Sequence, residues 1–350
     1  MKNANNINNK ELVYRTLLES QKKMSALELT KIKGASKDRT YISRILAQLI
    51  KEGRVASEKD GRFVRYYVAD YIIAIDENLD LRKTQEDFVW RAVRKNDDFF
   101  KNVSEQAKDI LSFTFTEMLN NAIDHSKSSI GHVRIWQENE LLKFSVRDFG
   151  IGIFKSIMAK KKYKTEIEAM QEVLKGKLTT APSAHSGEGI FWTSKIADCI
   201  IFESSNLRLT IDNRISDYTI EELEEIKIGT EVYFEVAKDT EKSLSALFHQ
   251  YSFDHDNLTL DTTMIPIKLY REGEAWVSRS QAKHVLNGLE KFKKIVFDFN
   301  GIDLIGQGFA DEIFRVFNIE HPDIILEPIN MSPTVELLVK RAQNDSTGRE

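Results

Sequence analysis

The chain has 350 residues, 41% hydrophobic and 30% charged, a composition typical of globular proteins with two or three domains. No stretch reaches the roughly 18 consecutive apolar residues of a membrane-spanning helix, and the first residues, MKNANNINNKELVYR, lack the apolar segment of a secretion signal. Because Cys199 is the single cysteine, an intramolecular disulfide is excluded, and we expect a cytoplasmic protein without a membrane partner.

The first seventy residues predict three helices followed by a β-hairpin. The segments ELVYRTLLESQ and SALELTKI have helical apolar spacing, and Ser25 is placed to cap the second. In GASKDRTYISRILAQLIKEGRV, Ser36 is a candidate cap for a third helix, whose inward stripe comprises Ile42, Ile45, Leu46 and Leu49. Two short strands then meet at Asp60-Gly61, a pair typical of a tight hairpin turn.

Positive charge is concentrated in this region. From Lys31 to Arg65 there are ten Lys and Arg against four Asp and Glu, a net charge of +6 in a chain whose total is −4. Three helices and a hairpin over residues 8–70 resemble a winged helix-turn-helix, which implies that the third helix enters the major groove of double-stranded DNA. The residues that would then face DNA are Lys37, Arg39, Thr40, Tyr41, Ser43 and Arg44 on the helix, with Arg62 and Arg65 on the wing. The alternative is a winged helix that contacts only protein, with its charges solvated.

The middle of the chain contains four short sequence patterns, one after another. Glu117 and Asn121 lie four residues apart in a predicted helix, EMLNNAIDHS. Asp148-Phe149-Gly150-Ile151-Gly152 follows a predicted strand, Gly187-Glu188-Gly189 precedes a helix, and Gly229-Thr230 enters a strand. Each pattern alone also fits a simple turn or a surface pair. In this order, within Asp87–Lys238, they resemble the GHKL ATPases, a superfamily that includes gyrase, heat-shock chaperones, histidine kinases and mismatch-repair ATPases.

This resemblance implies a Bergerat-type α/β sandwich that binds ATP and Mg²⁺. Asn121 would ligate Mg²⁺, Asp148 would accept a hydrogen bond from the adenine amino group, and Thr230 would add a hydroxyl near the base. Gly150 and Gly152 would let the backbone pass close to adenine, while Gly187 and Gly189 would present N–H groups to the phosphates. Residues 155–186 would form a mobile lid, from which Lys177 or His185 is a candidate to reach the γ-phosphate.

Glu117 favours hydrolysis over mere binding, because hydrolytic members of the superfamily use a glutamate here as the general base. Glu188 departs from the pattern, since many relatives have an apolar residue between these glycines. It is expected either to face solvent or to repel the γ-phosphate and slow turnover. An orthodox histidine autokinase is not expected, because His125 is the first of the seven histidines and none precedes the Asn121 helix.

The C-terminal part alternates strand and helix signals. An apolar strand over Ile295–Phe299 is followed by a turn at Gly306-Gln307-Gly308 and a helix over Phe309–Phe317. This stretch resembles the STAS-type domains of anti-sigma-factor antagonists, in which such a turn presents a phosphorylatable serine. Here the turn carries Gln307, so we expect an interaction module without phosphorylation at that turn. Ser278 and Ser280 are expected to cap a helix.

The sequence therefore predicts a multidomain α+β protein: a winged helix-turn-helix at 1–72, a GHKL ATPase domain at 73–240 and a STAS-like α/β domain at 255–345. The expected function is a regulator that couples the nucleotide state to DNA binding, with a protein partner for the STAS-like domain and homodimerisation left open. The alternatives are an anti-sigma-type serine/threonine kinase and a non-enzymatic nucleotide-sensing adaptor.

Overall fold

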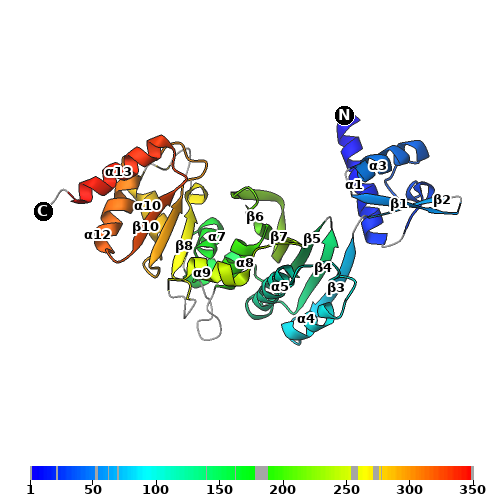
Figure 1. Cartoon of the computed structure of the whole chain (residues 1–350), viewed down its shortest axis with the longest axis horizontal. Coiled ribbons are helices and arrows are strands. Elements are labelled where there is room, and N and C mark those ends of the chain that lie inside the picture. Colours follow the sequence, from blue (N-terminus) through cyan, green and yellow to red (C-terminus); the bar gives the residue numbers. More distant parts are fainter. Residues whose placement is uncertain are drawn as a thin grey trace.

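The described part of the chain forms an elongated arrangement of α-helices and three separate β-sheets (Figure 1). This computed structural model describes residues 2–20, 23–51, 54–61, 63–68, 71–138, 140–161, 163–177, 188–253, 259–270, 276 and 278–347. A two-stranded sheet lies near one end, a five-stranded sheet in the middle and a three-stranded sheet near the other end. Among the described helices, none combines the length and apolarity needed to cross a bilayer.

The N-terminal unit contains three helices and a β-hairpin: α1 (Lys2–Ser20), α2 (Ala26–Leu29), α3 (Arg39–Lys51), β1 (Val55–Asp60) and β2 (Phe63–Val68). The hairpin prediction is confirmed, since Asp60 pairs with Phe63 across the turn. Ser25 caps α2 as expected. At α3 the expected cap was wrong: Asp38 Oδ1, not Ser36, accepts the N–H of Thr40 at 2.8 Å, because α3 begins at residue 39. The predicted stripe of α3 is buried in the core of this unit.

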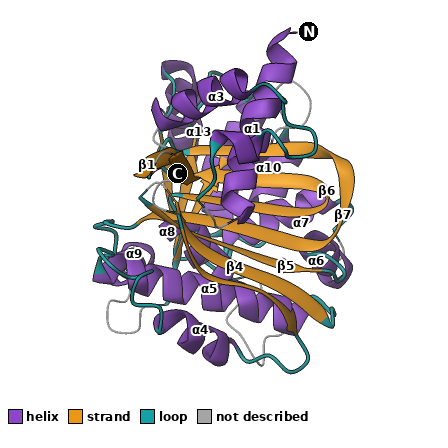
Figure 2. Cartoon of the chain, turned by 90° about the vertical axis from the view of Figure 1, so that its right-hand side faces the viewer, coloured by secondary structure: helices purple, strands orange, loops and turns teal. Residues whose placement is uncertain are grey.

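The middle unit is built on an antiparallel sheet of order β3-β4-β5-β7-β6: β3 (Ile72–Asp80), β4 (Ile130–Glu138), β5 (Leu141–Asp148), β6 (Cys199–Asp212) and β7 (Asp217–Ala237). Its helices are α4 (Glu86–Arg94), α5 (Glu105–His125), α6 (Ile153–Lys161), α7 (Glu166–Lys175), α8 (Gly189–Ile196) and α9 (Leu244–Tyr251). Helix α5 packs on β5 and β7, with α4 beside it (Figure 2). The Phe144 and Phe234 rings stack at 4.8 Å, and Phe115 from α5 makes a T-shaped contact with Phe144 at 5.6 Å.

The C-terminal unit is a parallel sheet of order β10-β9-β8 with helical connections: β8 (Thr262–Pro266), η1 (Ile267–Tyr270), α10 (Arg279–Leu286), β9 (Lys294–Asp298), α11 (Gln307–Asp311), η2 (Glu312–Phe317), α12 (Asn318–Glu320), β10 (Ile325–Ile329) and α13 (Pro333–Thr347). The predicted strand–helix alternation is confirmed. Phe309, Ile313 and Phe317, spaced four apart, are all buried, as the helical period requires.

The buried hydrophobic side chains of the described residues form two separate clusters. One belongs to the N-terminal unit, from Val13 to Val68. The other runs without interruption through the middle and C-terminal units, from Ile75 to Ala342. The N-terminal unit contacts the middle sheet through polar groups, including a hydrogen bond from Tyr14 to Glu138. The last two units therefore share a core, whereas the first contacts the middle unit through polar groups.

Candidate functional site

A cavity of about 160 Å³ lies between α5, α6, α7, α8 and strands of the five-stranded sheet. Six of the residues predicted from the sequence line it: Glu117, Asn121, Asp148, Gly152, Gly189 and Thr230. These residues come from separate segments of the chain, so only the folded structure brings them together. Gly150 lies in the same turn as Asp148, while Gly187 and His185 fall outside the described residues.

Helix α5 carries the acidic and amide groups of the cavity. It begins after Ser104, whose hydroxyl accepts a hydrogen bond from Ala107 N at 3.1 Å. Because its apolar stripe packs into the core, Glu117 and Asn121 are left on the side that lines the cavity. Asn121 Nδ2 is buried and has no hydrogen-bond partner among the described residues. A buried amide donor requires an acceptor, which a ligand in this cavity would supply.

Asp148 forms the second polar wall of the cavity. Its side chain is 5% exposed, and Oδ1 accepts the N–H of Gly150 at 2.9 Å. Burial raises the pKa of Asp148 above its ordinary value, and hydrogen bonds from Gly150 and Thr230 oppose this shift only in part. Thr230 Oγ1 also accepts the N–H of Ile153 at 2.9 Å, which ties β7 to the start of α6. A carboxylate held in this way is a fixed acceptor for a donor group of a ligand.

Gly150 is required by close backbone approach. A Cβ atom at this position would lie 1.9 Å from the carbonyl oxygen of Ser126, at the C-terminal end of α5. The same oxygen accepts the N–H of Ile151 at 2.9 Å. The turn after β5 therefore packs directly on the end of α5, and this contact fixes Asp148 relative to Asn121.

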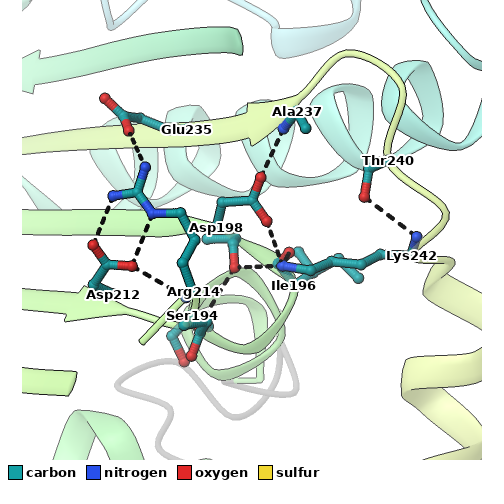
Figure 3. Close-up of polar contacts among 11 residues, drawn as sticks. Ser194, Ile196, Asp198, Asp212, Arg214, Glu235, Ala237, Thr240 and Lys242 are labelled. Carbon is teal, nitrogen blue, oxygen red and sulfur yellow. Dashed lines mark hydrogen bonds and ion pairs between the residues drawn. The ribbon is translucent and has the colours of Figure 1, made fainter. Parts of the chain in front are cut away.

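Helix α8 is held firmly at its C-terminal end (Figure 3). Lys242 Nζ donates to the carbonyl oxygen of Ile196 at 3.3 Å and pairs with Asp198 Oδ1 at 2.6 Å. Asp198 Oδ2 in turn accepts the N–H of Ala237 on β7 at 2.7 Å. A lysine at the negative end of the helix dipole is favourable, and it anchors α8 to the sheet.

The other end of α8 faces the cavity. A Cβ at Gly189 would lie 1.9 Å from Glu117 Oε2, so glycine allows the carboxylate to reach the first turn of α8. Glu188 is not among the residues that line the cavity; its Oε2 accepts a hydrogen bond from the indole Nε1 of Trp192 at 3.3 Å. Burial raises the pKa of Glu188, and the neighbouring charges of Lys177 and Asp261 act on it in opposite directions.

The segment expected to form a lid is partly described. Within residues 155–177 the chain forms most of α6 and all of α7, and the side chains from Ala169 to Lys175 are buried. Lys177, a candidate for the γ-phosphate, instead pairs with Asp261 at 3.6 Å and donates to the carbonyl oxygen of Lys291 at 3.4 Å. The rest of the expected lid, residues 178–186, lies outside the described residues.

Sequence reasoning did not assign several polar residues that line the cavity: Asn120, Asp124, His125, Ser126 and Ser156. Helical spacing contained a signal for one of them, because Asp124 follows Glu117 by seven residues on the same helix. Ser156 lies on α6, and its proximity depends on how that helix packs, which local spacing does not report.

The residues predicted to face DNA lie mainly on the surface of the N-terminal unit. Lys37, Arg39, Thr40 and Arg44 are exposed, while Tyr41 and Ser43 are partly buried. On the hairpin, Arg65 is engaged within the unit: its guanidinium pairs with Glu28 at 2.7 Å and with Asp60 at 3.2 Å. Arg62 lies outside the described residues.

In the C-terminal unit, Gln307 is exposed at the first position of α11. Ser278 caps α10 in a reciprocal arrangement with Gln281, as expected. Ser280 lies exposed within α10 and does not cap it, because the helix begins at residue 279.

Comparison with known proteins identifies one part of the chain. No curated protein matches the sequence. Residues 281–336 match the family model of a STAS-like domain of unknown function (DUF4325). The matched segment runs from α10 to the start of α13 and contains β9 and β10 of the parallel sheet. The protein is thus a multidomain α+β chain whose C-terminal part is similar to STAS-like domains.

Proposed function

We propose that the middle unit is a GHKL-type ATPase domain with a Bergerat fold, and that its cavity binds Mg-ATP. The observation that carries this proposal is the convergence of Glu117, Asn121, Asp148, Gly189 and Thr230 on one cavity. These residues belong to four sequence patterns whose order resembles that superfamily. A chance set of turns and surface pairs would have no reason to share a cavity.

The chemistry of the lining fits a nucleotide. Asp148, supported by Gly150 and Thr230, supplies an acceptor for the adenine amino group. Asn121 Nδ2, which has no hydrogen-bond partner in the described part of the chain, fits a phosphate oxygen, and Oδ1 fits Mg²⁺. The first turn of α8, at Gly189, offers backbone N–H groups to phosphate. Bound Mg²⁺ would neutralise part of the phosphate charge.

Glu117 is the general base in this proposal. Its carboxylate lies beside Gly189, at the helix terminus proposed to bind phosphate. In hydrolysis, Glu117 accepts a proton from the attacking water as the water oxygen bonds to the γ-phosphorus. The bond from that phosphorus to the bridging oxygen breaks, and ADP leaves with the electron pair.

We further propose that the N-terminal unit is a winged helix-turn-helix that binds double-stranded DNA, in a cytoplasmic regulator whose DNA affinity depends on nucleotide. This is supported by Lys37, Arg39 and Arg44, which are exposed at and near the start of α3. Arg65 contributes less than the sequence suggested, because two carboxylates already neutralise its charge. Equal DNA affinity with and without nucleotide would contradict the coupling.

The decisive test measures phosphate release from Mg-ATP by the full chain and by Glu117→Ala. We expect release by the wild type and a loss of about 10²–10⁴-fold in the variant, the usual contribution of a general base. Nucleotide binding should survive in the variant. Transfer of label from γ-labelled ATP to a protein would instead indicate a kinase, and absence of ATP binding would indicate a non-enzymatic adaptor.

A further inference from the structure

Helix α7 belongs to the middle unit, where it packs on α6 and α8, and it also contacts the C-terminal unit. Val173 lines the cavity. Gln171, Glu172 and Lys175 on the same helix are only 5%, 3% and 0% exposed, respectively. The helix packs against β8 of the C-terminal sheet. One short helix therefore contributes both to the cavity wall and to the interface with the STAS-like unit.

Gln171 is bonded on both sides of its amide by the C-terminal unit. Its Nε2 donates to the carbonyl oxygen of Leu269 at 2.6 Å. Its Oε1 accepts a hydrogen bond from Nε2 of His284, on α10, at 2.8 Å. A buried amide with both ends satisfied defines a single orientation, because any shift of α7 leaves a buried polar group unpaired.

Lys175 forms the second polar link. Its ammonium group is ion-paired with Glu172 and donates to the carbonyl oxygen of Asn287 at 2.8 Å, at the C-terminal end of α10. Lys175 thereby caps a helix of the other unit, where its charge is favourable. Its own carbonyl oxygen accepts a hydrogen bond from Thr263 Oγ1 on β8 at 2.7 Å. We call Gln171, Lys175 and His284 the α7 anchor.

We propose that the α7 anchor positions the cavity wall and makes the STAS-like unit a regulator of nucleotide binding. The inference rests on the proposed binding of Mg-ATP. Because the anchor ties α7 to β8 and α10, α7 moves together with those elements. A partner that displaces the STAS-like unit then changes the nucleotide affinity, and by linkage nucleotide changes the affinity for that partner by the same factor. Gln171, Lys175 and His284 are positioning residues, since none of them lines the cavity.

The test uses the full-length protein with Gln171→Ala, His284→Ala and the double variant. Lys175 is left intact, because its removal would strand the buried Glu172 carboxylate and endanger folding. Lys340→Ala, which removes an exposed ion pair on α13, is the control in the same unit. His284→Gln keeps a donor and serves as the rescue. Affinity for a non-hydrolysable Mg-ATP analogue is measured by calorimetry, and KM and kcat by phosphate release.

Each single variant should weaken analogue binding and raise KM by about fivefold or more, the range of typical coupling, with kcat within about twofold of wild type. The double variant should match the larger single effect, because each single change already removes the hydrogen bond between Gln171 and His284. His284→Gln and Lys340→Ala should bind like wild type. In the unmodified protein, the analogue should slow amide hydrogen exchange within Arg279–Leu286.

Wild-type affinity in folded Gln171→Ala and His284→Ala proteins would overturn the inference and leave the proposed function standing. Exchange in α10 that does not respond to the analogue would also overturn it, without dependence on any variant. If the unmodified protein does not bind the analogue at all, the proposed function fails and the inference fails with it.

Discussion

Replacement of Gly150 by alanine should destabilise the middle unit and weaken nucleotide binding together. The added Cβ would lie 1.9 Å from the carbonyl oxygen of Ser126, whereas a normal carbon–oxygen contact is about 3.3 Å or more. Relief of this clash requires a shift of roughly 1.4 Å, which also breaks the hydrogen bond from Ile151 N to the same oxygen. Overpacking costs about 1–3 kcal/mol and the lost hydrogen bond about 1 kcal/mol, so the free energy of unfolding should fall by about 2–4 kcal/mol.

The assay is denaturant unfolding followed by tryptophan fluorescence, combined with calorimetric titration of an ATP analogue. Gly301→Ala is the control: its φ is +74° and, apart from its chain neighbours, no atom of the described residues lies within 4 Å of the added Cβ. Its cost of about 1–2 kcal/mol comes from backbone conformation alone, and nucleotide affinity should not change. An unfolding free energy for Gly150→Ala within about 0.5 kcal/mol of wild type would refute the steric reasoning.

Three further perturbations test other parts of the molecule. Burial raises the pKa of Asp148, so its carboxylate takes up a proton at higher pH than an exposed aspartate. Protonation then stabilises the unliganded fold but removes the proposed adenine acceptor, so ATP affinity measured by titration should fall as the pH is lowered below neutral. A flat profile would contradict this role. Arg44→Ala should weaken DNA binding and lower the slope of log affinity against log salt concentration by about 1. Arg65→Ala should change both quantities less, and equal effects of the two variants in a salt titration would reject this distinction. Lys242→Met should lower the free energy of unfolding by about 1–2 kcal/mol, because carbonyl groups at the end of α8 lose a charged donor, and an unchanged denaturation midpoint would show that water replaces it fully.

Local sequence patterns were enough to predict the buried side of α3 and the position of the hairpin turn. The stripe of Ile42, Ile45, Leu46 and Leu49 follows the helical period and is buried as predicted. The Asp60-Gly61 pair lies at the hairpin turn because the two residues suit its backbone conformation. The order of the four sequence patterns was enough to predict residues of the cavity lining, because each pattern can be read from neighbouring residues alone.

Local patterns did not determine the partners of long charged side chains. Arg65 and Lys177 were expected to face ligands, yet they pair with acidic residues distant in sequence. Lys175, in the stretch EVLKGK, has the local context of a solvated cation. It is nevertheless fully buried, because it pairs with Glu172 and also donates to carbonyl groups at the end of α10, more than a hundred residues away. Hydrophobic periodicity encodes which side of an element is buried, but the element that covers it is decided only when the whole chain folds.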